Sequence, residues 1–383
     1  MQPPGAAYLR LACLSYDDED DEAPRRALAA AGVLAESPQL TRTDPHVAAA
    51  ASDVDALAAL LAADPALANQ TGGPHDWPPL LYLCYARHDP ALDEAAVLAT
   101  ARLLLAAGAD PNARFHWGGL DPPFTALTGA FGGGERGQPP HPHAVALARV
   151  LLEAGADPND GQTLYNRMFT PDDSHLELLF AYGLDSRELL RSQLSWAVTH
   201  GMTERVRLLA AHGTDVTTPF PGGPAPAVLA HTSGHPEVVA ALGVPAPTLA
   251  PADAFISAAL AADRAACEAA HPDVVASLRA DRPGLAVWAA AHGRPGAVGL
   301  LLDAGWPVDA LGRTDVPREE PWQTALHAAA QAGDVALARE LLARGADPAV
   351  RDPRFGATPL DWARFFHQAQ VADLLTPYEP PGS

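Results

Sequence analysis

Apolar residues recur along this chain at helical spacing, in short stretches that each end at a glycine. The segments LLLAAGADPNAR (103–114), LLEAGADPND (151–160) and LLARGADPAVR (341–351) share one pattern: an apolar helix end, a glycine and then Asp-Pro. Glycine suits the left-handed residue that closes a helix, and Asp-Pro disfavours further helix. The pattern therefore predicts a series of short helices, each closed by a glycine turn.

Weaker copies of the same phrase end at Asp185, Asp215 and Asp309. The closing glycines or their substitutes are spaced at about 30 residues over most of the chain, and a shorter helical stretch precedes each of them. One such helix pair is too small to bury its apolar face alone, so neighbouring pairs must stack. We expect an all-α solenoid of about ten stacked helix-turn-helix units.

The last two units begin with a characteristic phrase. TALHAAAQAGD (324–334) and TPLDWAR (358–364) resemble the start of the ankyrin repeat, T-P-L-H-x-A, whose period is about 33 residues. We identify the chain as similar to ankyrin-repeat proteins, with degenerate repeats over most of its length. The resemblance implies a solenoid with a concave binding surface and a structural, hydrogen-bonding role for His327.

This interpretation divides the chain into three parts. Residues 1–43 are expected to form an N-terminal helical capping unit with an acidic loop at 17–22, DDEDDE. Residues 44–351 should form the ankyrin-repeat array, with insertions near 131–143 and 311–321. Residues 352–383 should form a C-terminal capping repeat and tail.

The first insertion contains GGGERGQPPHPH (132–143), which offers two chemical interpretations. Residues 132–137 match G-x-G-x-x-G, but a dinucleotide site needs a preceding strand, and here a helical stretch precedes the glycines. His141 and His143 could be metal ligands, but no further clustered ligand completes a site in the sequence. We expect no cofactor and no bound metal. The open alternatives are a protruding recognition loop and a passive insertion.

Composition narrows the possible chemistry. Every basic residue is Arg, so mechanisms that need a Walker lysine, a Schiff base or a Ser-Lys pair are excluded. The three cysteines are far apart and no C-x-x-C occurs, which favours buried thiols over a disulfide framework. No G-x-S-x-G surrounds a serine. We therefore expect a protein that is not an enzyme.

Charge and hydropathy indicate the kind of partner. The net charge is −21, so the average surface repels nucleic acid and anionic membranes and favours a partner protein with a basic surface. The chain shows neither a signal-peptide pattern nor an apolar stretch long enough to span a bilayer. A cytoplasmic, monomeric protein is the expectation.

Two other residue patterns have a structural and a functional interpretation. His231 and His235 stand four apart in HTSGH but lack the acidic residue of a zinc-binding H-E-x-x-H, so a structural role is favoured. Trp196, Trp288 and Trp362 share one repeat position, which favours packing between repeats over ligand stacking.

Three functional classes remain. The leading one is a non-enzymatic interaction scaffold that binds a basic protein through its concave face and inserted loops; an inhibitor or immunity-type protein masking a cationic enzyme is the second. A small-molecule or metal binder at 132–143 is the third. In the resembled family the last turn of each first helix faces the concave surface. The expected partner contacts are Tyr85, Arg136, His141, His143, Thr199, His200, His292 and Gln331.

Overall fold

The computed structural model describes residues 3–14, 16, 23–88, 91–135, 137–316 and 318–379. Within these ranges the chain forms 23 α-helices, several short 3₁₀ turns and one pair of two-residue strands, so the all-α expectation is confirmed. The acidic run 17–22 and Arg136 lie outside the described residues. None of the helices in the described ranges combines the length and apolar character needed to cross a lipid bilayer.

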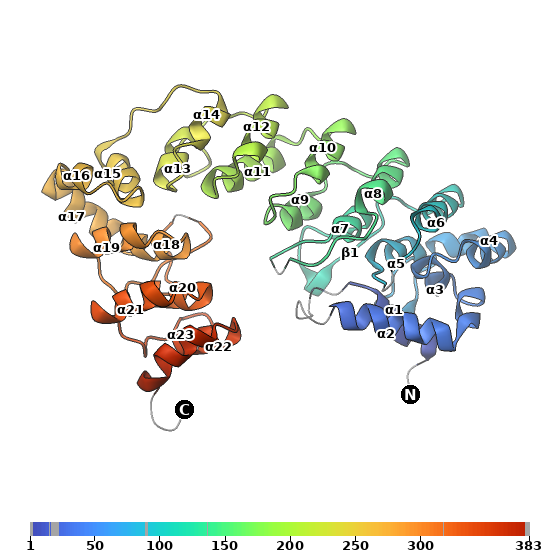
Figure 1. Cartoon of the computed structure of the whole chain (residues 1–383). Helices are drawn as coiled ribbons and strands as arrows, with labels where there is room; N and C mark the ends of the chain where they lie inside the picture. The colour runs from blue at the N-terminus through green and yellow to red at the C-terminus, as the bar shows by residue number, and fades with distance from the viewer. Residues whose placement is uncertain are drawn as a thin grey trace. The chain divides into compact units, whose positions relative to one another are not determined.

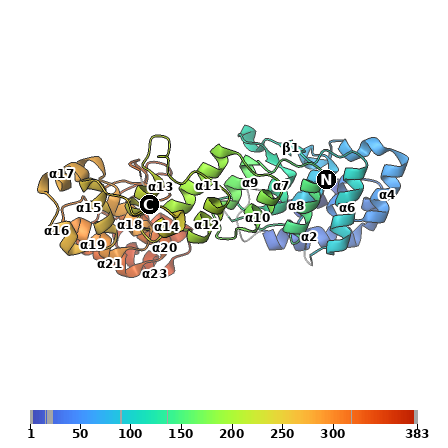
Figure 2. The ribbon, with the colours of Figure 1, turned by 90° about the horizontal axis from the view of Figure 1, so that it is seen from above.

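The chain separates into two compact units, residues 1–193 and 194–383, a division that the repeat pattern did not indicate. Figure 1 shows both as successions of helix pairs, and Figure 2 views the same pairs from above. The helices of the first unit are α1 (Pro4–Ala12), α2 (Ala23–Glu36), α3 (Pro45–Ala50), α4 (Val54–Ala63), α5 (Pro79–Tyr85), α6 (Glu94–Ala106), α7 (Ala126–Phe131), α8 (Ala144–Glu153), α9 (Gly161–Arg167) and α10 (Ser174–Ala181).

The first unit stacks its helices in two rows. The shorter first helices α3, α5, α7 and α9 contact one another in order, and the second helices α4, α6, α8 and α10 form the other row. This arrangement buries one apolar face of each pair against the next pair. A hairpin of β1 (Arg114–Phe115) and β2 (Phe124–Thr125) precedes α7, with a 3₁₀ turn, η4 (Trp117–Gly119), at its tip.

The second unit continues the helix-pair pattern. Its C-terminal pairs also stack in order: α18 contacts α20, and α20 contacts α22. Helix α11 (Arg187–Thr199) contains the boundary between the units. The remaining helices are α12 (Thr203–Ala211), α13 (Pro226–Thr232), α14 (Val238–Leu242), α15 (Pro251–Leu260), α16 (Arg264–Glu268), α17 (Pro272–Asp281), α18 (Leu285–Ala291), α19 (Pro295–Asp303), α20 (Ala325–Ala332), α21 (Val335–Ala343), α22 (Pro359–Phe365) and α23 (Ala369–Leu375).

Local signals in the sequence account for the helix ends. Thr324 and Thr358 cap α20 and α22, and each forms a reciprocal capping box with the residue three positions on. Gly108 and Gly345 follow second helices with φ near +90°, the left-handed region that glycine enters without steric cost. The predicted caps and glycine turns are therefore confirmed.

Alanines recur at one buried position in the first helices of the second unit. Ala289, Ala329 and Ala363 are fully buried at corresponding positions of α18, α20 and α22. A methyl group at these positions lets adjacent first helices approach closely, which explains how an alanine-rich chain with few aromatic residues makes a continuous core. Trp288 and Trp362 are buried as predicted, whereas Trp196 is partly exposed.

Candidate functional site

Two predicted contact residues that are distant in the sequence meet in the second unit. His200 directly follows α11 and His292 directly follows α18, so each lies in the turn between the two helices of its pair. Their ring centroids are 6.0 Å apart. Repeat position therefore places both imidazoles in equivalent turns, and tertiary packing brings the two turns together.

Each of these imidazoles stacks on the indole one helical turn earlier. The ring centroids of His200 and Trp196 are 3.9 Å apart, and those of His292 and Trp288 are 3.7 Å apart. Each Nδ1 lies close to the carbonyl oxygen of the same tryptophan, at 2.9 Å for His200 and 2.8 Å for His292. Since a carbonyl oxygen only accepts, Nδ1 carries the proton, and Nε2 of the neutral ring is an acceptor.

A third imidazole packs beside the pair. A Cβ added to Gly201 would lie 2.4 Å from Nδ1 of His235, so the His235 ring lies directly over this glycine. We call Trp196, His200, His235, Trp288 and His292 the inner-turn cluster. Nδ1 of His235 also lies 3.1 Å from a carboxylate oxygen of Glu237.

Burial makes the inner-turn cluster electrically neutral near pH 7. Burial lowers the pKa of His292 to about 4, and the charges of His200, His235 and Arg294 also lower this pKa. The hydrogen bond to the carbonyl oxygen of Trp288 acts in the opposite direction, because it favours the charged imidazole. Burial also lowers the pKa of His200 and of His235. Three neutral rings can thus lie together without the repulsion that three imidazolium ions would suffer.

Trp288 and Arg294 connect the turns that carry the cluster. The Trp288 indole Nε1 is 3.4 Å from the carbonyl oxygen of Ser233, and the Arg294 guanidinium donates to the carbonyl oxygens of Gly234, at 2.8 Å, and Leu260, at 3.2 Å. Sequence reasoning missed Arg294. Its position directly after the turn glycine Gly293 could have drawn attention to it. The carbonyl groups that it binds are distant in the sequence, so they could not be predicted from it.

The other predicted contact residues fall into two groups. Tyr85, His141 and Thr199 are buried, with 0%, 2% and 3% of their surface exposed, so the expectation that they present exposed side chains is wrong. Tyr85, for example, packs against α7 of the next pair, where a Cβ added to Gly129 would lie 2.3 Å from its ring. In contrast, Gln331 of α20 is exposed.

His143 is partly buried and already engaged. Its Nε2 donates to the carbonyl oxygen of Leu92 at 2.6 Å, and its Nδ1 lies 3.3 Å from a carboxylate oxygen of Glu94. Both partners belong to the preceding helix pair. The ring therefore joins two successive pairs and leaves little of its polar edge for a partner.

The described residues of the insertion, 132–135 and 137–143, fold back onto the stack, which corrects the expectation of a protruding loop. The Gly133 N–H donates to the carbonyl oxygen of Gln138, and the Gly134 N–H donates to that of Asn166, both at 2.7 Å. A Cβ on Gly133 would lie 2.4 Å from the Asn166 oxygen. The glycines are thus needed for close backbone packing, an explanation that involves no phosphate ligand.

A buried arginine anchors the same insertion. The Arg87 guanidinium donates to the carbonyl oxygen of Pro139 through Nε at 3.1 Å and Nη2 at 2.9 Å, and to that of Gly129 through Nη2 at 2.8 Å. Burial lowers the pKa of Arg87 to about 10. The carbonyl groups replace the water lost from this side chain and join the insertion to α5 and α7.

The two histidines of the insertion contact each other. His141 Nδ1 accepts the His143 backbone N–H at 3.1 Å, and burial lowers the pKa of His141 well below its usual value. Among the residues that the structure describes, no group of three or more His, Cys, Asp or Glu side chains could hold a metal ion.

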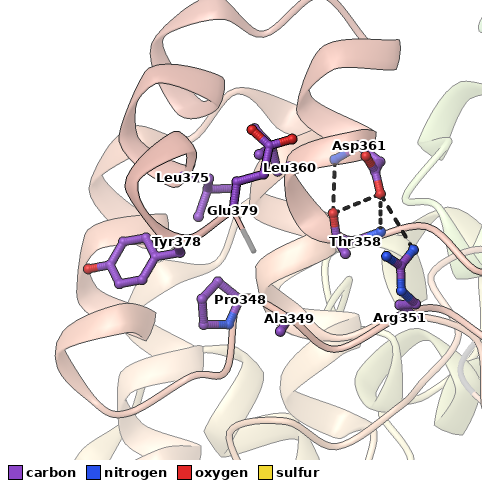
Figure 3. A pocket seen from close by; sticks show the side chains of 9 residues that line it. All are labelled: Pro348, Ala349, Arg351, Thr358, Leu360, Asp361, Leu375, Tyr378 and Glu379. Atoms are coloured by element: carbon purple, nitrogen blue, oxygen red, sulfur yellow. Dashed lines mark hydrogen bonds and ion pairs between the residues drawn. The ribbon is translucent and has the colours of Figure 1, made fainter. Parts of the chain in front are cut away.

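A small cavity is lined by residues of α22 and of the segments that flank α22 and α23 (Figure 3). Its volume is about 30 Å³, room for little more than one water molecule. The Thr358 N–H and hydroxyl each donate to Asp361 at 2.8 Å, and Arg351 lies 4.0 Å from the same carboxylate. These contacts cap α22 at one side of the cavity.

Stacked helix pairs with short turns, and side chains from equivalent turns gathered into one cluster, define a helical-repeat protein. In agreement, residues 286–381 match the family model of ankyrin repeats, in three copies. This chain therefore contains ankyrin repeats, as the resemblance of TALHAAAQAGD and TPLDWAR predicted. None of the curated proteins compared with it matches the chain. Ankyrin repeats are in general modules for protein–protein interaction.

Proposed function

We propose that this chain is a non-enzymatic scaffold that binds a partner protein with a basic surface, using the turns between the helices of its repeats. The inner-turn cluster is the observation that carries the proposal. It joins the half-buried imidazoles of His200 and His292, 6.0 Å apart, from two separate helix pairs. Tryptophan is enriched among the residues that dominate binding energy at protein interfaces, and the indole of Trp196 in this cluster is partly exposed.

The chemistry of these rings suits a cationic donor. Both imidazoles are neutral near pH 7, since burial lowers their pKa, and each has its Nδ1 proton engaged with a carbonyl oxygen. Each Nε2 lone pair is then available to an N–H of arginine or lysine. The net charge of −21 adds a long-range attraction for a basic surface.

The proposed partner contacts are fewer than those predicted from the sequence. His200, His292 and the exposed Gln331 are kept as direct contacts, whereas His143 joins two successive helix pairs. Tyr85, His141 and Thr199 support the stack from within. An inhibitor of a cationic enzyme is a special case of this function, distinguished by whether the captured partner is an enzyme that loses activity in the complex.

The test begins with capture of a partner from the native host and continues with stopped-flow kinetics on the purified pair. Association should slow steeply between low and physiological salt, because screening shortens the reach of the acidic field to roughly 8 Å. His200→Ala and His292→Ala should each raise the dissociation rate roughly tenfold and leave the salt dependence unchanged.

The matched control is His271→Ala, which removes an imidazole of the same unit that lies outside the cluster and is 71% exposed. It should leave the dissociation rate unchanged. A salt-independent association rate would contradict the basic partner, and equal dissociation from all three variants and the parent would contradict the inner-turn contact.

A further inference from the structure

The first unit contains a pocket whose side chains are almost all aromatic. Its volume is about 210 Å³, and it lies between the turn that ends at Trp77 and the hairpin that carries Phe115 and Trp117. Tyr16, which follows α1, lines the same pocket. We call this space the aromatic pocket. It is separate from the inner-turn cluster, which belongs to the second unit.

Backbone pairing explains how three distant segments meet there. Gly72 and Trp77 exchange two hydrogen bonds of 3.1 Å, which closes the first turn. The hairpin 114–125 is closed by the pairing of β1 with β2. After α1, the chain runs beside the end of α5, where the Leu14 N–H donates to the carbonyl oxygen of Tyr85 at 2.8 Å and so directs Tyr16 towards the hairpin.

The aromatic rings of the pocket pack against one another, and one of them is partly exposed. The centroids of Trp77 and Phe115 are 4.4 Å apart, and those of Trp77 and His75 are 4.5 Å apart, so the buried Trp77 is held between two rings. The centroid of Trp117, at the tip of the hairpin, is 6.4 Å from that of Tyr16. Trp117 remains partly exposed and can contact a ligand with little rearrangement.

Charges of both signs lie near the pocket, and the preference for a cation comes from the ring faces and from a carboxylate at the rim. Burial lowers the pKa of His75 to about 4, with Arg10 and Arg26 adding to the effect, so its imidazole is neutral. The exposed carboxylate of Asp121 lies 3.3 Å from Nδ1 of His116, which also lines the pocket. The faces of aromatic rings attract cations, and a carboxylate at the rim strengthens that attraction.

Two further features bear on the sign of the charge. In sequence, Tyr16 directly precedes six acidic residues, 17–22, within a chain whose net charge is −21. Of the two guanidinium groups that act on His75, that of Arg26 donates to the carbonyl oxygens of Arg10 and Cys13, so it is directed into backbone acceptors. The pocket thus combines an aromatic lining with a carboxylate at its rim.

We propose that the aromatic pocket receives one cationic side chain, an alkylammonium or guanidinium group, of the partner protein. This inference rests on the proposed function, to which it adds a second contact and the chemistry of that contact. The ring faces replace part of the water around the cation, and the apolar stem of the side chain packs against the indole of Trp117.

Small cationic probes test the pocket without the partner. The probes are the N-acetyl amides of arginine, lysine and trimethyllysine, together with the uncharged tert-butyl isostere of trimethyllysine, each titrated into the full chain by calorimetry. The trimethyllysine probe should bind one site roughly tenfold more tightly than its isostere. Equal affinity of the two would overturn the cationic assignment, and no binding of any cationic probe would overturn the site.

Variants of the hairpin tip locate the binding. Trp117→Leu keeps an apolar side chain without a π face and should weaken the trimethyllysine probe roughly tenfold, whereas Trp117→Phe should restore most of the affinity. Leu120→Ala is the matched control, since Leu120 lies on the same hairpin, is 57% exposed and does not line the pocket. Unchanged binding in Trp117→Leu would place the probe elsewhere and overturn the proposal.

Protection from hydrogen exchange gives a second measurement on the unmodified chain, independent of whether a variant folds. The trimethyllysine probe should slow exchange at residues 114–119, and a lack of protection there would overturn the site. Failure of the probes with retained, salt-dependent partner binding would remove the pocket and leave the proposed function. Binding of the probes without capture of any protein would support the pocket and contradict the proposed function.

Discussion

The first repeats and the last repeats of this protein form the same junction with different residues. In the C-terminal repeats, His327 Nε2 donates to the carbonyl oxygen of Ala357 in the next repeat at 3.1 Å, and Nδ1 lies 2.8 Å from the Thr324 hydroxyl. Near the N-terminus, His46 Nε2 donates to the carbonyl oxygen of Gln70 at 2.9 Å, and Nδ1 lies 2.8 Å from Asp44. The cap is an aspartate in one case and a threonine in the other.

The repeat that begins with α7 has threonine, Thr128, in place of the histidine. Thr125 and Thr128 form the capping box of α7, and the Thr128 hydroxyl lies 3.2 Å from that of Thr163 in the next repeat. A side-chain hydrogen bond at the start of the first helix is therefore retained while the side chains change. The family model matches 286–381, where the consensus residues remain, although the helix pairs of the first unit stack in the same way.

The largest effect should come from the arginine that holds the insertion in the first unit. Arg87→Met should lower the free energy of unfolding by about 4 kcal/mol, because the carbonyl groups of Gly129 and Pro139 lose their donor inside the protein. Chemical denaturation followed by circular dichroism measures the change. The exposed Arg149→Met of α8 is the control and should change stability by less than about 0.5 kcal/mol.

The same substitution also tests the correction made to the loop. If the insertion did not pack on the stack, hydrogen exchange at its residues would be fast both in the parent chain and in Arg87→Met. We expect slow exchange in the parent and fast exchange in the variant.

The next effect tests the equivalence of the two histidine junctions. His327→Leu and His46→Leu should each lower the free energy of unfolding by about 2–3 kcal/mol, because each removes a buried hydrogen bond between repeats. Hydrogen exchange should rise around each substituted junction. A large effect of His327→Leu beside a negligible one of His46→Leu would show that the N-terminal junction is held by other contacts.

The smallest effect concerns acid. The pKa of His292 is lowered to about 4 in the folded chain from a usual 6.5, so its contribution to stability is complete above pH 6.5 and is lost as the pH falls towards 4. The loss from this one group is roughly 2 kcal/mol after allowance for its partial exposure. His200 and His235, whose pKa values are also lowered, and Arg294 face the same ring.

His292→Gln removes this titrating group. It should flatten the pH dependence of hydrogen exchange in residues 285–292 between pH 6.5 and 4, relative to the parent chain. His271→Gln, outside the inner-turn cluster, is the control and should leave that dependence unchanged. An equally steep profile in His292→Gln and the parent would show that other groups cause the acid sensitivity.

Most of the local structure could be predicted from the sequence. The glycine before Asp-Pro, the threonine before the first helix and the apolar spacing act over a few residues, so they predicted the turns, the caps and the helix pairs, and TALHAA identified the repeat. The buried state of Tyr85, His141 and Thr199 could not be predicted in the same way. Burial depends on which helix pair covers the position, and a single repeat does not show it.

The sequence by itself determined that this protein is acidic and consists of stacked helix pairs. Only the tertiary structure decided that His200 meets His292, that Arg87 anchors the 132–143 insertion and that Tyr16 joins Trp77 and Trp117 around one pocket. The physical reason is the distance along the sequence over which each interaction acts. Caps and turns depend on residues that are neighbours in the sequence. The contacts between distant turns depend on how each helix pair packs on the next, and small differences in this packing add up along the stack.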